Sequence, residues 1–84
     1  MVERVKFDFR KVTARQMSEV FRAARENDMT GMAEIFAKIV VECPPEWGNP
    51  NDPGTYLDLP YYGEDGFLGL LRHFTSESQS AAKN

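Results

Sequence analysis

The chain has 84 residues, the size of one small domain. Its 42% apolar and 12% aromatic content is too high for a wholly disordered chain, while 27% charged residues favour solubility. No stretch approaches the ~18 consecutive apolar residues of a membrane-spanning helix, and no secretion signal follows the charged first residues. A single cysteine, Cys43, excludes an internal disulfide framework, so we expect a cytoplasmic protein that does not bind membranes.

The net charge is −3, but the two signs are unevenly distributed along the chain. Residues 1–25 carry seven basic and three acidic side chains, whereas the remainder carries three basic and ten acidic ones. The acidic pI, near 5.0, argues against a nucleic-acid-binding protein, which would present a basic surface. Solvated charged faces explain this distribution best, and the alternative is that opposed charges orient copies head to tail or steer a partner. Together with the unpaired strand edge described next, the opposed charges lead us to expect a homo-oligomer.

The first predicted element is a strand over Val5–Phe9, where apolar and charged residues alternate with a period of two. A lone strand leaves its backbone groups unpaired, so this one needs a partner. The partner is either another subunit or an internal segment, for which Thr55–Leu59 is the best candidate.

Two amphipathic helices follow the strand. Thr13 and Gln16 have the spacing of a capping box, which predicts that the first helix begins here and ends near Asn27. Its predicted core stripe is Ala14, Met17, Val20, Phe21 and Ala24. Thr30 is placed to cap the second helix, whose predicted core stripe is Met32, Ile35, Phe36, Ile39 and Val40.

The short connection between these helices predicts an antiparallel hairpin with the two stripes packed together. Pro44 and Pro45 should end the second helix near Val41 or Glu42.

A loop rich in proline but also in large apolar side chains covers Trp47–Pro60. Burial of those side chains is favourable, so we expect the loop to pack on the core. Asp52 followed by Pro53 predicts one short helical turn inside it.

A third apolar helix of about ten residues should begin near Phe67 and end near His73 and Phe74. Gly69 in its interior costs about 1 kcal/mol relative to alanine, which suggests close backbone contact with a neighbour. We expect one helical domain over residues 1–74 and a disordered polar tail over residues 75–84. The predicted fold class is therefore mainly α, with a minor β component.

No residue pattern predicts catalysis. His73 is the only histidine, and Cys43 has no cationic neighbour in sequence that would activate its thiol. The segment beginning at Asn49 resembles a calcium loop in part, but Pro60 stands where the bidentate glutamate is required. Asp52 is better explained as a helix cap than as a catalytic carboxylate. We expect a protein without enzymatic activity, metal or cofactor.

The central segment resembles a family. An aromatic-Gly-Asn-Pro sequence at Trp47–Pro50 leads into Asp-Pro-x-x-Tyr-x-x-Leu at Asp52–Leu59, and an apolar helix follows. This arrangement, together with small size and acidity, resembles the tail assembly chaperones of tailed bacteriophages and prophages, over roughly residues 17–74. The resemblance implies a helical protein that binds the tape measure protein, keeps it soluble and helps to recruit tail tube subunits. It also implies a longer frameshifted companion.

We expect the partner to be bound through exposed aromatic side chains, which supply contact area at low entropic cost. The predicted partner-facing residues are Trp47, Tyr56, Tyr61, Tyr62 and Phe67. The alternative function is that of a small regulatory or accessory protein that binds a host or phage protein. The alternative role for the aromatic residues is closure of a small core, and for Trp47 and Tyr56 we favour that role.

Overall fold

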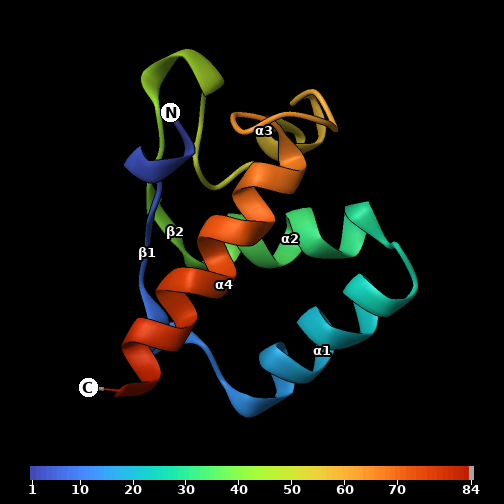
Figure 1. The fold of residues 1–84 in the computed structure, drawn as a ribbon, viewed down its shortest axis with the longest axis vertical. Coiled ribbons are helices and arrows are strands. Elements are labelled where there is room, and N and C mark those ends of the chain that lie inside the picture. Colours follow the sequence, from blue (N-terminus) through green and yellow to red (C-terminus); the bar gives the residue numbers. More distant parts are fainter. Residues whose placement is uncertain (84) are drawn as a thin grey trace.

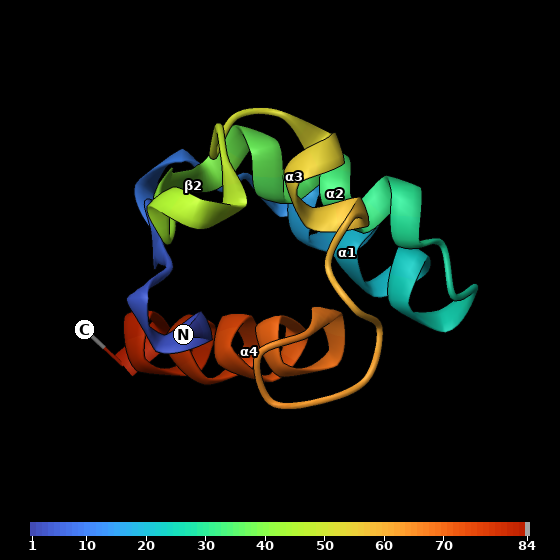
Figure 2. The same ribbon diagram turned by 90° about the horizontal axis from the view of Figure 1, so that it is seen from above.

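The computed structural model describes residues 1–83 and is mainly helical, as predicted. The elements are β1 (Lys6–Phe7), α1 (Ala14–Arg25), α2 (Met29–Ile39), β2 (Val40–Glu42), α3 (Pro53–Leu57) and α4 (Phe67–Lys83). Short 3₁₀ turns cover Val2–Arg4, Phe9–Lys11 and Pro45–Trp47. Helices α1, α2 and α3 form one layer and α4 forms the other, with the two strands at one end (Figures 1 and 2).

The N-terminal strand pairs inside the chain. β1 runs antiparallel to β2, with Lys6 opposite Glu42 and Phe7 opposite Val40 (Figure 1). The strand is shorter than the predicted Val5–Phe9, because Phe9 begins a 3₁₀ turn. Val5 is buried and Lys6 is exposed, but the predicted alternation ends there, since Phe7, Asp8 and Phe9 are all half-buried. The proposed partner segment Thr55–Leu59 is wrong, because most of it forms α3. With its edge already paired to β2, β1 supplies no argument for a second subunit.

Helix α1 begins with the predicted capping box. The Thr13 hydroxyl accepts a hydrogen bond from the Gln16 amide at 3.1 Å, and the Gln16 side chain accepts one from the Thr13 amide at 3.0 Å. The face that packs on α2 is rotated from the predicted stripe, because Val20 and Ala23 are buried. Phe21 was expected in the core but is 60% exposed, and Ala14 and Ala24 are exposed with it.

Asp28, not Thr30, caps α2. The Asp28 carboxylate accepts a hydrogen bond from the Gly31 amide at 2.9 Å, which satisfies one of the free amides at the helix start. The prediction of Thr30 as the cap is wrong because the helix begins at Met29, two residues earlier than a Thr30 cap would place it. The turn between the helices is closed by Asn27 in a left-handed conformation, with φ of 55°.

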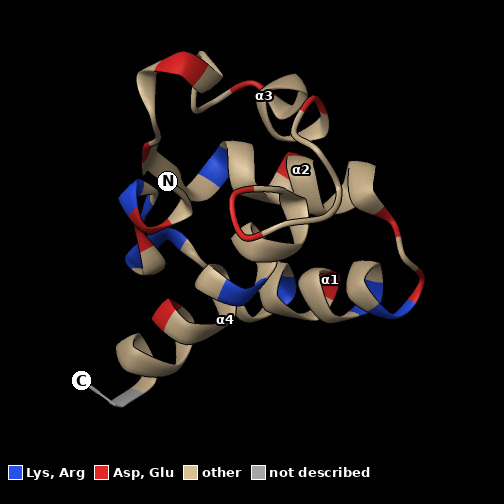
Figure 3. Ribbon diagram, turned by 45° about the horizontal axis from the view of Figure 1, so that its top comes forward, with Lys and Arg blue, Asp and Glu red and all other residues tan. Residues whose placement is uncertain are grey.

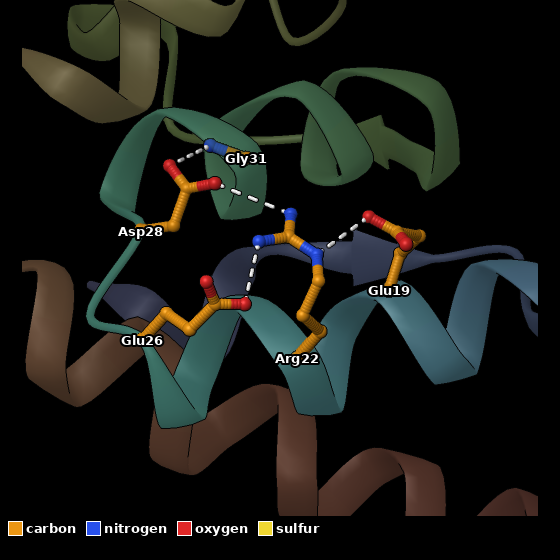
Figure 4. Close-up of polar contacts among 5 residues, drawn as sticks. All are labelled: Glu19, Arg22, Glu26, Asp28 and Gly31. Atoms are coloured by element: carbon orange, nitrogen blue, oxygen red, sulfur yellow. Dashed lines mark hydrogen bonds and ion pairs between the residues drawn. The ribbon is translucent and has the colours of Figure 1, made fainter.

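Arg22 ties the two ends of this turn together. Its guanidinium lies 3.0 Å from Glu19, 3.0 Å from Glu26 and 3.2 Å from the second oxygen of Asp28 (Figure 4). Three carboxylates from α1 and the start of α2 therefore converge on one cation. The cluster joins the end of α1 to the start of α2, and its four groups together carry a net charge of −2.

Helix α2 ends at Ile39, earlier than predicted, because the chain changes to an extended conformation at Val40 and forms β2. The side-chain amide of Asn51 donates hydrogen bonds to the carbonyls of Ala37, at 3.0 Å, and Val40, at 3.3 Å. The proline-rich loop thus satisfies carbonyls at the end of α2 that the helix itself leaves free.

The predicted stripe on α2 is the centre of the core. Met32, Ile35, Phe36, Ile39 and Val40 are all buried. The largest side chains with almost no exposure come from three helices, from β2 and from residues that lie close to the two strands in the sequence: Val5, Met32, Phe36, Ile39, Val40, Pro44, Tyr56 and Leu70.

Helix α4 is longer than predicted. It continues to Lys83, so the expected disordered tail is helical over residues 75–83, while residue 84 lies outside the described residues. His73 therefore lies in the middle of a helix and not near its C-terminal end. Its Nε2 atom is 2.9 Å from the carbonyl oxygen of Val5, which joins α4 to the N-terminal segment.

The ionised Asp28 should stabilise the hairpin in a pH-dependent way. The hydrogen bond from the Gly31 amide, and then the Arg22 guanidinium, lower the pKa of Asp28 below its ordinary value of 3.8. A lowered pKa gives stability that is present above the ordinary value and is lost as the pH falls through the folded-state value. Asp28→Asn should therefore lower the melting temperature at pH 7, and the difference from the native chain should shrink below about pH 4.

Thermal unfolding between pH 2 and 7 measures this. Glu34→Gln is the matched control, since it removes one exposed carboxylate from the same helix outside the cluster. A difference between Asp28→Asn and the native chain that stays constant with pH would contradict the assignment.

Candidate interaction surface

Two of the five aromatic residues expected to face a partner lie in the core. Tyr56, on α3, is fully buried, and its hydroxyl donates a hydrogen bond to the carbonyl of Pro50. Burial raises the pKa of the Tyr56 phenol, so it stays protonated. Phe67, at the start of α4, is 3% exposed. Both rings pack against Phe36, with their centroids 5.7 and 6.1 Å from the centroid of its ring. The prediction that Tyr56 and Phe67 face a partner is therefore wrong.

Trp47 is half-buried and packs against the core from the 3₁₀ turn at Pro45–Trp47. The neighbouring Cys43 is buried, and burial raises the pKa of its thiol, which makes the reactive thiolate scarce at neutral pH. Both residues thus serve chiefly to attach the proline-rich loop to the core.

Tyr61 and Tyr62 are the two predicted residues that the structure leaves exposed. Tyr61 is 40% exposed and Tyr62 is 78% exposed. Their ring centroids lie 4.9 Å apart at an interplanar angle of 87°, an edge-to-face pair. The two rings form a single aromatic projection on the segment between α3 and α4. Residues 58–66, which carry it, are called the tyrosine loop below.

The tyrosine loop is held by backbone hydrogen bonds to the start of α4. The Phe67 amide donates to the Pro60 carbonyl at 2.8 Å, and the Leu68 amide donates to the Tyr61 carbonyl at 3.1 Å. Gly63 lies at the loop tip with φ of +103°, a conformation that favours glycine. The exposed rings are therefore carried by a backbone whose path is fixed.

Two further glycines allow close backbone contacts at the loop. A Cβ atom on Gly66, the last residue of the loop, would collide with the carbonyls of Pro60 and Tyr62 in the same loop, and one on Gly69 of α4 would collide with the carbonyl of Glu64. The sequence-based expectation that Gly69 makes a close backbone contact is confirmed, and the neighbour is the tyrosine loop. Without a side chain, Gly66 lets the loop fold tightly on itself and Gly69 lets it approach α4.

The loop is acidic as well as aromatic. Asp58 and Glu64 are exposed and form no ion pair with the side chains of residues 1–82. Asp65 is 2.6 Å from the N-terminal amine of Met1, an ion pair that lowers the pKa of Asp65. Figure 3 shows the acidic residues before α4 in red and the basic residues of the N-terminal segment and α1 in blue. The basic and acidic residues, which lie in different parts of the sequence, are thus also separated in the folded structure.

Three further apolar side chains are exposed that the sequence did not indicate as surface residues. They are Phe21, Val41 and Leu57, which are 60%, 54% and 41% exposed. Phe21 matched the helical period and was assigned to the core for that reason. Only the packing of α1 on α2, through Val20 and Ala23, decides that it faces outward.

The described residues offer no cluster of three histidine, cysteine or acidic side chains that could hold a metal ion. Within the same part of the chain, every helix is too short or too polar to cross a bilayer. Comparisons of the chain with protein-family models, with curated proteins and with solved structures found no match. The exposed tyrosine pair is the feature of the surface that most clearly suits binding.

The close approach of loop and helix predicts that Gly69→Ala destabilises the fold. Alanine is better than glycine in a helix by about 1 kcal/mol, but the clash with the Glu64 carbonyl should outweigh that gain and give a net loss of about 1–3 kcal/mol. Urea unfolding measures the change. Ser76→Ala, at an exposed position of α4, is the control and should be neutral or slightly stabilising. A Gly69→Ala protein as stable as the control would show that the loop does not lie against α4.

Proposed function

We propose that the protein is a non-catalytic tail assembly chaperone of a bacteriophage or prophage, which binds the tape measure protein through the tyrosine loop. The likeness of the Trp47–Leu59 segment to that family motivates the proposal. The observation that carries it is the exposed Tyr61–Tyr62 pair on a loop of fixed path.

A fixed aromatic pair suits the binding of apolar helices. Tyrosine supplies a large contact area with few rotatable bonds, so little entropy is lost when a partner covers it. The loop backbone is already ordered by its bonds to Phe67 and Leu68, which lowers that cost further. A partner can therefore bind to the exposed tyrosine rings while the protein stays folded.

In the proposed mechanism, the tyrosine loop reversibly covers the apolar face of a partner helix. An amphipathic helix of the tape measure protein would place its apolar side chains across the rings of Tyr61 and Tyr62. Asp58 and Glu64 beside the rings would favour helices flanked by basic residues. A contact of this size falls below the standard area of stable complexes, so it would be weak and readily reversed. Release of the partner to tail tube subunits requires such reversibility.

Co-expression with the tape measure protein of the same phage or prophage tests the proposal. The double variant Tyr61→Ser/Tyr62→Ser should keep its helical circular dichroism and leave most of the tape measure protein insoluble. Leu57→Ser is the matched control, because it removes an exposed apolar side chain outside the tyrosine pair and should keep the partner soluble.

Phe36→Ala is the structural control and should unfold the protein, since it empties the centre of the core at a cost of about 3–5 kcal/mol. The proposal fails if the double tyrosine variant keeps the tape measure protein as soluble as the native chain does. The site assignment fails if the double variant loses as much helix as Phe36→Ala.

A further inference from the structure

A groove of about 480 Å³ lies at the C-terminal end of α4, far from the tyrosine loop. One wall comes from the segment before α1 and from α1 itself, and the other comes from α4. It is lined mostly by Phe9, Val12, Met17, Ala81 and Ala82, with Arg10 among them. Its volume lies within the range of about 300–1,000 Å³ that is typical of binding pockets.

The surroundings of the groove are basic. Arg10 lines the groove and its side chain is 93% exposed, although its Nε atom is 3.1 Å from Asp8. Lys11, the next residue in the chain, is also exposed. An occupant that suits the groove would combine apolar or aromatic side chains with acidic flanks.

The tyrosine loop has this chemistry. It presents two exposed rings, Tyr61 and Tyr62, between the unpaired carboxylates of Asp58 and Glu64. The loop directly precedes the first residue of α4, while the groove is lined by residues near the other end of the helix (Figure 1). A helix of 17 residues is about 25 Å long, so the loop cannot enter the groove of its own copy.

We propose that the protein associates head to tail, with the tyrosine loop of one copy bound in the groove of the next. The rings of Tyr61 and Tyr62 contact the apolar lining, and Asp58 and Glu64 face Arg10 and Lys11. Because the two surfaces differ, each pair of copies keeps one free loop and one free groove. Association therefore continues beyond the dimer unless it closes into a ring.

The contact would also control partner binding, a role that rests on the proposed function. A tape measure helix and the groove of a second copy would compete for the same rings. Association of copies would then cover the binding surface until the partner is present. The association itself requires no partner and is measured with the purified protein alone, so it can fail or succeed independently of the chaperone proposal.

Analytical ultracentrifugation from about 10 µM to 1 mM tests the contact, because an interface this small should be weak. The native chain should show an average mass that rises above 9.6 kDa with concentration and passes twice that value. Ala81→Glu, which puts bulk and a negative charge in the groove, and Tyr61→Ser/Tyr62→Ser should each remain at the monomer mass.

Mixing these two variants distinguishes a head-to-tail contact from a symmetric one. Ala81→Glu keeps an intact loop and the tyrosine variant keeps an intact groove, so an equimolar mixture should form a dimer and stop there. Ser76→Glu adds the same charge at an exposed position of α4 outside the groove lining and should associate as the native chain does.

Three results would overturn the proposal: a native chain that is monomeric at 1 mM, variants that associate as strongly as the native chain, or a mixture that contains only monomers. Circular dichroism of each variant establishes that loss of association is not loss of fold.

Discussion

The packing of aromatic rings around Phe36 is the interaction on which the rest of this structure depends. Its ring centroid lies 6.0 Å from Phe7, 5.7 Å from Tyr56, 6.1 Å from Phe67 and 5.6 Å from Phe74. These rings come from β1, from α3 and from the N-terminal half of α4, so one side chain joins α2 to three other elements. A domain of 84 residues has a small core, and it gains much of its stability from such an assembly.

The same packing determines which aromatic residues remain available at the surface. Tyr56 and Phe67 are drawn into contact with Phe36, and the chain between α3 and α4 must then pass close to the start of α4. Gly69 allows that close passage, Gly66 allows the loop to turn tightly, and Tyr61 and Tyr62 are left on the outside. The exposed pair is thus a consequence of how the core is closed, and it is held in place by the same contacts.

Local patterns in the sequence predicted local structure well. The capping box at Thr13 and the core stripe around Phe36 depend on residues three or four apart, and the structure contains both. The pairing of Lys6 and Phe7 with β2 depends on packing between segments more than thirty residues apart, which no local period encodes. Phe21 fits the helical period as well as Val20 does, and only the orientation of α1 on α2 separates them. For the candidate site, composition indicated aromatic residues in the right region but not which of them the core would take.

Chemical nitration of the three tyrosines, mapped by mass spectrometry on the folded protein, tests most directly whether core and surface divide the aromatic residues in this way. The account predicts that Tyr62 reacts first, that Tyr61 reacts more slowly, and that Tyr56 reacts only after the protein is unfolded, because its ring is fully buried against Phe36. Nitration of Tyr56 in the folded protein at a rate similar to that of Tyr62 would contradict it.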